Sequence, residues 1–324
     1  MKTTTPLRTI LLLGLALCGL SADAQQKWPT KPIRMVHGFI SGGAVDITAR
    51  LLAAPMSEML GQQVIVDGRP GAGGTVGAGI VARGEPDGYT LFLMASGHAT
   101  SVGLYRNLPY DAVRDFTMIS MVAANPFVMA TASGYPAQTV ADVLRMAKEA
   151  PGKINYGTGG VGTGMHLASV LFQTRAGIKL NHIPYKGGNA APMALLSGEI
   201  PIIFNTPAGV DTHIASGRMR ALAITTGKRF SLWPNVPTIA ETLPGFDVRG
   251  WYAVAAPKGL PAPLLKRLNE VVQAALKRPE VSGKLVQLGA EVTPTTPDDA
   301  QKFLASEVAR WVKVIRDENI PPQN

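Results

Sequence analysis

Three glycine-rich segments, each between an apolar run and a helical pattern, constrain this chain most. They are 38–43, 71–74 and 157–164. Glycines at a strand end let the backbone turn sharply and let a ligand approach the main chain. The helix that follows each loop begins with unpaired N–H groups and a partial positive charge, which attract anions. We therefore predict small-anion binding at these loops, with simple turns as the alternative.

The hydrophobic pattern around the first two loops alternates between strand and helix. It predicts strand, helix, strand, helix and strand in succession over 31–37, 44–60, 63–66, 75–83 and 89–94. This order is typical of a parallel, doubly wound sheet. A second unit of the same kind begins with one long strand-like run over 118–131, and a tail rich in helices follows from 263.

The repeated unit predicts an α/β fold with two doubly wound domains and a hinged ligand cleft between them. Domain 1 is expected to comprise 25–122 together with 226–324, and domain 2 to comprise 123–225. A chain that crosses twice between domains can close around a small ligand.

Residues 1–24 are predicted to be a secretory signal peptide. Lys2 and Arg8 supply positive charge, and the apolar run 10–20 is too short to span a bilayer. The sequence Ala-Asp-Ala at 22–24 is a cleavage pattern, so cleavage is expected before Gln25.

The cysteine and histidine content argues against several kinds of site. Cys18, the only cysteine, would leave with the signal peptide, which excludes a disulfide scaffold, thiol catalysis and cysteine-ligated metals. The bulky leucine before it makes a poor lipoprotein site. The five histidines show no metal-ligand spacing, so we expect neither a metal nor another cofactor.

The formal net charge is +9, yet the basic residues are spread along the chain. A dispersed charge argues against a nucleic-acid surface, because such surfaces gather their Lys and Arg side chains. A cationic body still favours the approach of small anions.

The sequence GTGGVG at 157–162 matches the dinucleotide-binding pattern G-x-G-x-x-G. The acidic residue that binds ribose should follow about 20 residues later, but 177–186 contains no Asp or Glu. A nucleotide-binding enzyme is therefore a disfavoured alternative, and we expect no enzymatic activity. No nucleophile–base pair is evident either. Hydroxyl groups suited to hydrogen bonding rather than attack belong to Ser41, Ser96, Thr158 and Thr163.

Several polar residues have two interpretations each. His166 is interpreted as a packing or capping residue, with ligand contact as the alternative. Asp46 either complements its helix dipole or touches the ligand. Lys186 is expected to face solvent, with an ion pair to an anion as the alternative. His98 and Asn205 follow predicted strands on the ligand side, where an amide offers both donor and acceptor.

An ordered succession of short motifs extends over almost the whole mature chain. Through these motifs the chain resembles the Bug family of periplasmic solute-binding proteins, the receptors of tripartite tricarboxylate transporters. The motifs are WPTKPIR at 28–34, SGGAVD at 41–46, RPGAGG at 69–74, PDGYTL at 86–91, YGTGGVGTGMHL at 156–167, PYKG at 184–187, RALAITT at 220–226, VPTIAE at 236–241 and WYAVAAPKG at 251–259.

The resemblance implies a periplasmic, monomeric flytrap of the type II periplasmic-binding-protein kind. It would bind a di- or tricarboxylate, with an aromatic acid among the candidates, and deliver it to a tripartite tricarboxylate-type transporter. Backbone N–H groups, hydroxyls and ordered waters of both domains would grip the carboxylates. The ligand-binding residues carried over by the resemblance are Phe39, Ser41, Gly43, Asp46, Ser96, Thr158, Gly159, Thr163, His166, Tyr185 and Asn205.

Two departures from the family pattern bear on the ligand. The first loop, 37–41, lacks the prolines that usually precede its glycine pair, and Asn205 stands where members often have Asp. Loss of that carboxylate predicts a preference for polycarboxylates over amino acids. A secreted sensor that signals to a membrane partner is the alternative function.

Overall fold

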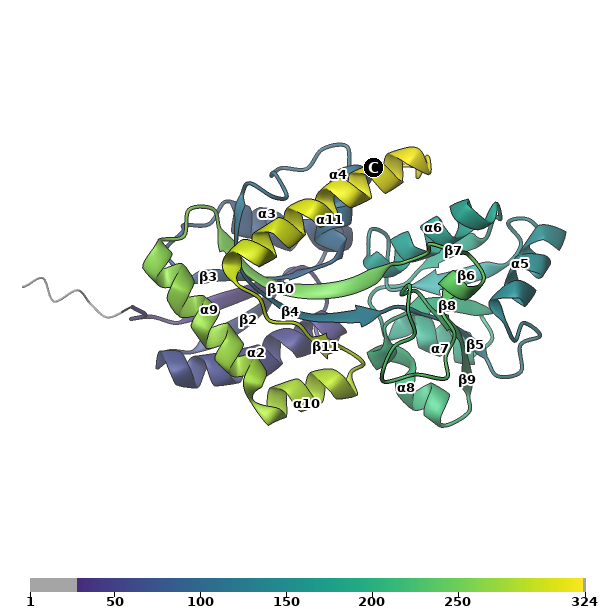
Figure 1. The fold of residues 1–324 in the computed structure, drawn as a ribbon, viewed down its shortest axis with the longest axis horizontal. Helices are drawn as coiled ribbons and strands as arrows, with labels where there is room; N and C mark the ends of the chain where they lie inside the picture. The colour runs from purple at the N-terminus through teal and green to yellow at the C-terminus, as the bar shows by residue number, and fades with distance from the viewer. Residues whose placement is uncertain (1–27, 323–324) are drawn as a thin grey trace, which may run out of the picture.

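A computed structural model describes residues 28–322 as two lobes, each built around its own β-sheet (Figure 1). The proposed signal peptide lies outside these residues. Lobe 1 has the strands β1 (Ile33–His37), β2 (Val64–Gly68), β3 (Thr90–Ala95), β4 (Phe116–Pro126), β10 (Arg249–Pro257) and β11 (Glu291–Val292). Lobe 2 has the strands β5 (Val128–Ala132), β6 (Asn155–Thr158), β7 (Asn181–Pro184), β8 (Ile202–Asn205) and β9 (Met219–Ile224).

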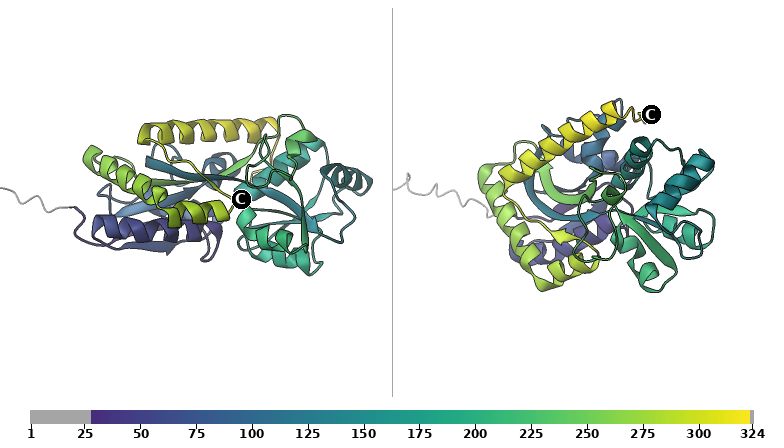
Figure 2. Two further views of the ribbon diagram at one scale, coloured as in Figure 1. Left: turned by 60° about the horizontal axis from the view of Figure 1, so that its bottom comes forward. Right: turned by 45° about the vertical axis from the view of Figure 1, so that its right-hand side comes forward.

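Helices cover both faces of the lobe 1 sheet (Figure 2). One face packs on α2 (Ala44–Leu60), α9 (Ala262–Lys277) and α10 (Pro279–Gln287). The other packs on α3 (Thr75–Ala82), α4 (Gly97–Leu104) and α11 (Pro297–Asp317). Lobe 2 carries α5 (Val140–Glu149), α6 (Gly164–Ala176), α7 (Ala190–Leu196) and α8 (Pro207–Ala215), and the short 3-10 helices are η1 (Ala72–Gly74) and η2 (Ile239–Glu241).

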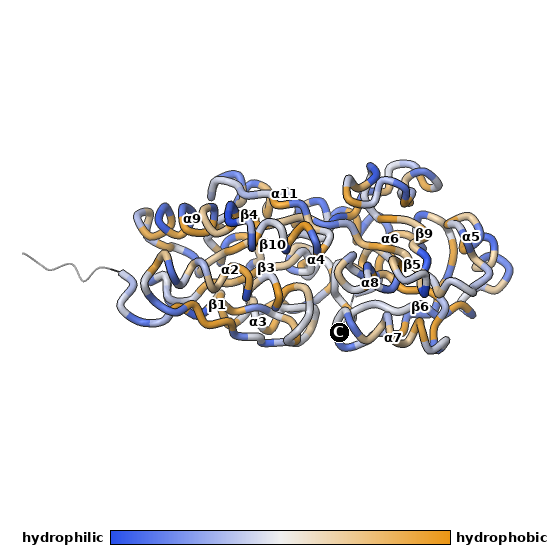
Figure 3. Tube along the Cα trace, turned by 90° about the horizontal axis from the view of Figure 1, so that it is seen from below, coloured by the Kyte–Doolittle hydropathy of each residue, from blue (hydrophilic) through white to orange (hydrophobic). Residues whose placement is uncertain are grey.

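Helix α2 forms where the apolar spacing predicts it. Its apolar positions, among them Leu52 and Met56, are fully buried against the sheet. Gly61 ends the helix in a left-handed conformation with φ +68°, which glycine adopts without steric cost. Polar and apolar residues also alternate along α9, which has one face toward the core (Figure 3). No helix within 28–322 is both long and apolar enough to cross a membrane.

The two sheets share one topology, which confirms the predicted α/β fold of two doubly wound units. Lobe 1 has the strand order β2-β1-β3-β10-β4 with β11 at the edge, and lobe 2 has β7-β6-β8-β5-β9. In each sheet three parallel strands are followed by one antiparallel strand, β10 or β5. That antiparallel strand is the first one the chain forms after crossing from the other lobe. The carboxyl ends of the parallel strands therefore face the junction.

The strand-like run predicted over 118–131 is two strands instead of one, and the chain passes between the lobes where the two meet. Strand β4 ends at Pro126 and β5 begins at Val128 in the other sheet. Both segments are buried and apolar, so periodicity alone gives no sign of the break. Helix α4 and the two-residue strand β11 were also missed; the α4 sequence, GHATSVGL, has no amphipathic pattern.

Thr225 ties the two crossing segments together at the junction of the lobes. Its side-chain oxygen accepts a hydrogen bond from the Phe127 N–H at 2.9 Å and donates one to the Val248 carbonyl at 2.7 Å. Its backbone N–H donates to the Phe127 carbonyl, and its carbonyl accepts from the Val248 N–H. The side chain is fully buried, so no water can replace these bonds. The domain boundaries near this junction stay a prediction.

Replacement of Thr225 by Val should destabilise the junction, because the buried Phe127 N–H and Val248 carbonyl each lose a partner. The expected loss is about 1–3 kcal/mol in the free energy of unfolding, measured by urea denaturation. The matched control, Thr225→Ser, keeps the hydroxyl and should lose less. Equal stability of the Val and wild-type proteins would contradict the assigned role.

Candidate functional site

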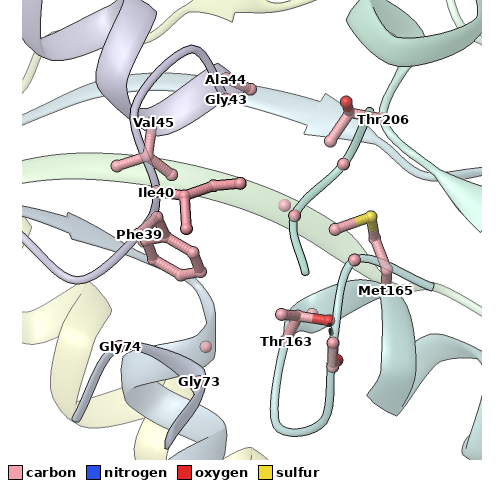
Figure 4. A pocket seen from close by; sticks show the side chains of 18 of the residues that line it. Phe39, Ile40, Gly43, Ala44, Val45, Gly73, Gly74, Thr163, Met165 and Thr206 are labelled. Atoms are coloured by element: carbon pink, nitrogen blue, oxygen red, sulfur yellow. Dashed lines mark hydrogen bonds between the residues drawn. The ribbon is translucent and has the colours of Figure 1, made fainter. Parts of the chain in front are cut away.

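A cavity of about 760 Å³ lies between the lobes (Figure 4). The loops after all six parallel strands line it: those after β1, β2 and β3 on one side and those after β6, β7 and β8 on the other. The crossing segments contribute Asn125, Phe127 and 250–252. This is where open α/β sheets hold ligands, just beyond the carboxyl ends of their strands.

Main-chain atoms form much of the wall, because glycine is the most frequent residue in the lining. The clearest set of donors is the start of α2. Gly43 caps this helix without a side-chain hydrogen bond, and the first intrahelical bond runs from the Ile47 N–H to the Gly43 carbonyl. The N–H groups of Ala44 and Val45 precede that bond, and both residues line the cavity. A carboxylate there would meet free donors and the positive end of a 17-residue helix.

Asp46 holds the loop that leads into α2. Its carboxylate accepts hydrogen bonds from the Gly42 N–H at 3.0 Å and the Arg50 Nε at 2.9 Å, and lies 3.1 Å from the His37 Nε2. Burial raises the pKa of Asp46, but these hydrogen bonds outweigh it and leave the pKa below the usual value. Asp46 is therefore ionised, and its charge is used by the protein's own loop.

Two stacked histidines support the glycine loop of lobe 2. The rings of His166 and His182 lie 4.5 Å apart, and the His182 Nε2 lies 2.8 Å from the Thr158 hydroxyl oxygen. The Gly162 N–H donates to the His166 Nδ1 at 3.4 Å. Burial lowers the pKa of both histidines to about 4, so both rings are neutral at pH 7. Thr163 caps α6 by accepting a bond from the His166 N–H.

Asn205 fixes the neighbouring loops instead of facing the cavity. Its Nδ2 donates to the Gly188 carbonyl at 2.7 Å and its Oδ1 accepts from the Thr206 N–H at 2.7 Å. An effect of Asn205 on ligand choice would thus act through the loops, not by contact.

Tyr185 lines the cavity, and its hydroxyl donates a hydrogen bond to Glu199. Burial together with that carboxylate raises the pKa of Tyr185 to about 12.

The cavity brings together about half of the residues predicted to bind the ligand. Those that line it are Phe39, Gly43, Ser96, Gly159, Thr163 and Tyr185. Those that the structure places outside the lining are Ser41, Asp46, Thr158, His166 and Asn205. Ser41 is exposed, while the other four are buried and bonded within their own lobe. His98 is also buried, stacked on Tyr110 with its Nε2 on the Ala112 carbonyl.

Apolar side chains form the part of the site that sequence reasoning missed. Figure 4 shows Ile40 and Val45 from lobe 1 opposite Met165 from lobe 2. The sequence does place an apolar residue beside each glycine loop. Sequence alone, however, does not distinguish an apolar residue that fills a core from one that lines a cavity. Among the lining residues only Lys186 is charged, and it is exposed. An anion in the cavity would therefore meet main-chain N–H groups and neutral side-chain donors such as the Ser96 hydroxyl, and no buried cation.

The lobes touch one another through small residues. Ile40 packs against Gly187, and the Asn189 Nδ2 donates to the Gly42 carbonyl at 3.4 Å. A Cβ at Gly164, in lobe 2, would lie 2.8 Å from the Ser96 Oγ of lobe 1. Glycine at this contact lets the two backbones approach and close the cavity between them.

Two similar lobes, two crossings and a cavity at their junction define a hinged solute-binding protein. Residues 48–320 match the family described as "Tripartite tricarboxylate transporter family receptor". The chain belongs to this family. The match covers both lobes.

Individual relatives agree with this assignment. The protein BugT of Bordetella pertussis is 36% identical over 318 residues, which cover 97% of this chain and 97% of BugT. The Rpa4515 structure from R. palustris, solved with adipate, has a TM-score of 0.85 at 34% identity and covers 91% of this chain and 100% of its own. MatC from Rhodopseudomonas palustris, solved with malate, has a TM-score of 0.83 at 28% identity. The match covers 89% of this chain and 100% of the MatC chain.

Enlarging Gly97 should keep the lobes apart. A Cβ there would lie 3.2 Å from the Gly162 carbonyl oxygen across the junction and 3.1 Å from the Gly73 oxygen, so the extra methyl groups of Gly97→Val leave no room for contact. Small-angle X-ray scattering should show a larger radius of gyration than for wild type. Gly283→Val is the control, because nothing lies near that glycine. An unchanged radius in both variants would contradict the close contact.

Proposed function

We propose that this chain is a periplasmic, non-enzymatic binding protein that captures a small carboxylate between its lobes and delivers it to membrane subunits of the tripartite tricarboxylate type. The observation that carries the proposal is the uncapped start of α2, which opens into a cavity lined mostly by main-chain atoms and apolar side chains. Family membership and the acids bound by two solved relatives support it. The cavity is complete within one chain, so a monomer suffices.

The lining favours an acid with an apolar body and no amino group. Phe39, Ile40, Val45, Val161 and Met165 surround the space beyond the α2 terminus. No Asp or Glu lines the cavity, so a ligand ammonium would lack a carboxylate partner and would be costly to bury. We therefore propose a di- or tricarboxylate with an aliphatic or aromatic body over an amino acid.

The direct test is to identify the ligand. Small molecules released from freshly purified protein are identified by mass spectrometry, and a thermal-shift panel compares adipate, malate, citrate, an aromatic diacid and glutamate. A ligand at 100 times its Kd stabilises the folded chain by about 2.7 kcal/mol, which raises the melting temperature. We expect the diacids to raise it and glutamate not to. The absence of a shift with every acid would refute the proposed function.

Lys186 should matter little, because main-chain donors hold the anion in this account. Replacement by Met keeps the length of the side chain and removes the only charge in the lining. The Kd for adipate, measured by isothermal titration calorimetry, should rise no more than about threefold, which is below 1 kcal/mol. Lys258→Met is the control, because Lys258 is an exposed residue of lobe 1 that does not line the cavity. A hundredfold loss confined to Lys186→Met would show that a cation carries the binding.

A further inference from the structure

A fully buried histidine stands at the base of the loop that carries the proposed anion donors. His37 is the last residue of β1, and its side chain is completely inaccessible to solvent. The loop that follows, 38–43, contains three glycines and no proline. A glycine-rich loop samples many conformations unless other contacts fix it. Ordering such a loop on binding would cost affinity, so the donors need to be held in place beforehand.

Both ring nitrogens of His37 make contacts that reach opposite ends of this loop. The Nδ1 accepts a hydrogen bond from the Phe39 N–H at 3.4 Å. The Nε2 lies 3.1 Å from the Asp46 Oδ1, and the other oxygen of that carboxylate accepts the Gly42 N–H. The ring thus connects the beginning of the loop, through Asp46, to its end at the start of α2.

These partners determine the tautomer of the ring. An ionised carboxylate only accepts hydrogen bonds, so the Nε2 must carry the proton that it shares with Asp46. The Nδ1 must then be unprotonated, because the Phe39 N–H donates to it. A doubly protonated ring would direct an N–H at the Phe39 N–H and lose that contact.

The surroundings of His37 favour this neutral form. Burial lowers its pKa below 6.5, although the neighbouring Asp46 carboxylate opposes the shift. Arg50 on α2 lowers the pKa further, and Asp67 on β2, itself paired with Arg34 and Arg69, raises it. From α3, Gly77 packs against the His37 backbone and brings no charge.

We propose that His37 is a positioning residue for ligand capture, which holds the 38–43 loop through Phe39 and Asp46 so that the donors at the start of α2 meet the anion without first being ordered. The inference rests on the proposed function and adds a residue that does not itself line the cavity. The same loop carries Ile40 and Gly42, which touch lobe 2, so its position also affects closure.

Three substitutions separate the two contacts. The side-chain oxygen of His37→Asn occupies the place of Nδ1 and can accept from Phe39, but it cannot reach Asp46. His37→Gln reaches Asp46 but has no acceptor beside the Phe39 N–H. His37→Val loses both contacts. If the Val protein fails to fold, the Asn and Gln proteins still decide between the two contacts.

Amide hydrogen exchange of the ligand-free proteins reads out the loop directly, with the Ile47 amide of α2 as an internal reference. Relative to this reference, Phe39 and Gly42 should exchange at least tenfold faster in His37→Val. In His37→Asn the Phe39 amide should stay within threefold of wild type, and in His37→Gln the Gly42 amide should do so. In the wild type, long-range ¹H–¹⁵N spectra at pH 7 should show a proton on Nε2 only. Unchanged exchange in all variants, or a protonated Nδ1, would overturn the inference.

Adipate binding connects the loop to function. Its Kd, measured by calorimetry, should rise at least tenfold in His37→Val and less in the Asn and Gln proteins. An unchanged Kd in His37→Val would refute the positioning role while leaving the proposed function intact. The predicted exchange pattern in a protein whose wild type binds no acid would instead support the role of His37 in the loop and count against the proposed function.

Discussion

Ligand binding in this account depends on the unpaired N–H groups at the start of α2. It also depends on the glycines around them, which have no side chains to keep an anion away. Such groups at a helix start hydrogen-bond to water when no other partner is present. A carboxylate can replace that water and also interact with the helix dipole. Because the cavity offers no buried cation, the protein avoids the cost of desolvating a fixed charge. Ile40, Val45 and Met165 form an apolar wall beside these donors. Different acids would therefore be distinguished by the shape of the part that joins their carboxylates.

The fold places these donors where two lobes can enclose them. Both sheets use the same strand order, and each chain crossing makes the antiparallel strand of the sheet it enters. This arrangement directs six parallel strand ends at one junction. Thr225 binds the crossing segments together there. Glycines at the contact between the lobes allow the two backbones to approach closely.

The sequence predicted the fold more fully than the site. Helix α2 and the strand–helix alternation have strong periodicity, and the glycine loops marked the correct strand ends. A crossing near residue 122 was expected, but the division of the 118–131 run into β4 and β5 was not, because the two strands are equally apolar. At the site, Asp46, His166 and Asn205 were correctly placed near the loops, but the direction of a polar side chain depends on its buried partner. His37 supplies that partner for Asp46, and only the three-dimensional register of β1 and α2 reveals it.

The most direct measurement is a crystal structure of the protein with the acid it carries when purified. The account predicts a ligand carboxylate within hydrogen-bond distance, about 2.7–3.2 Å, of the Ala44 and Val45 nitrogens, with its body against Ile40 and Met165. A carboxylate paired mainly with Lys186, or a ligand bound outside the cavity, would contradict the claim that main-chain donors hold the anion.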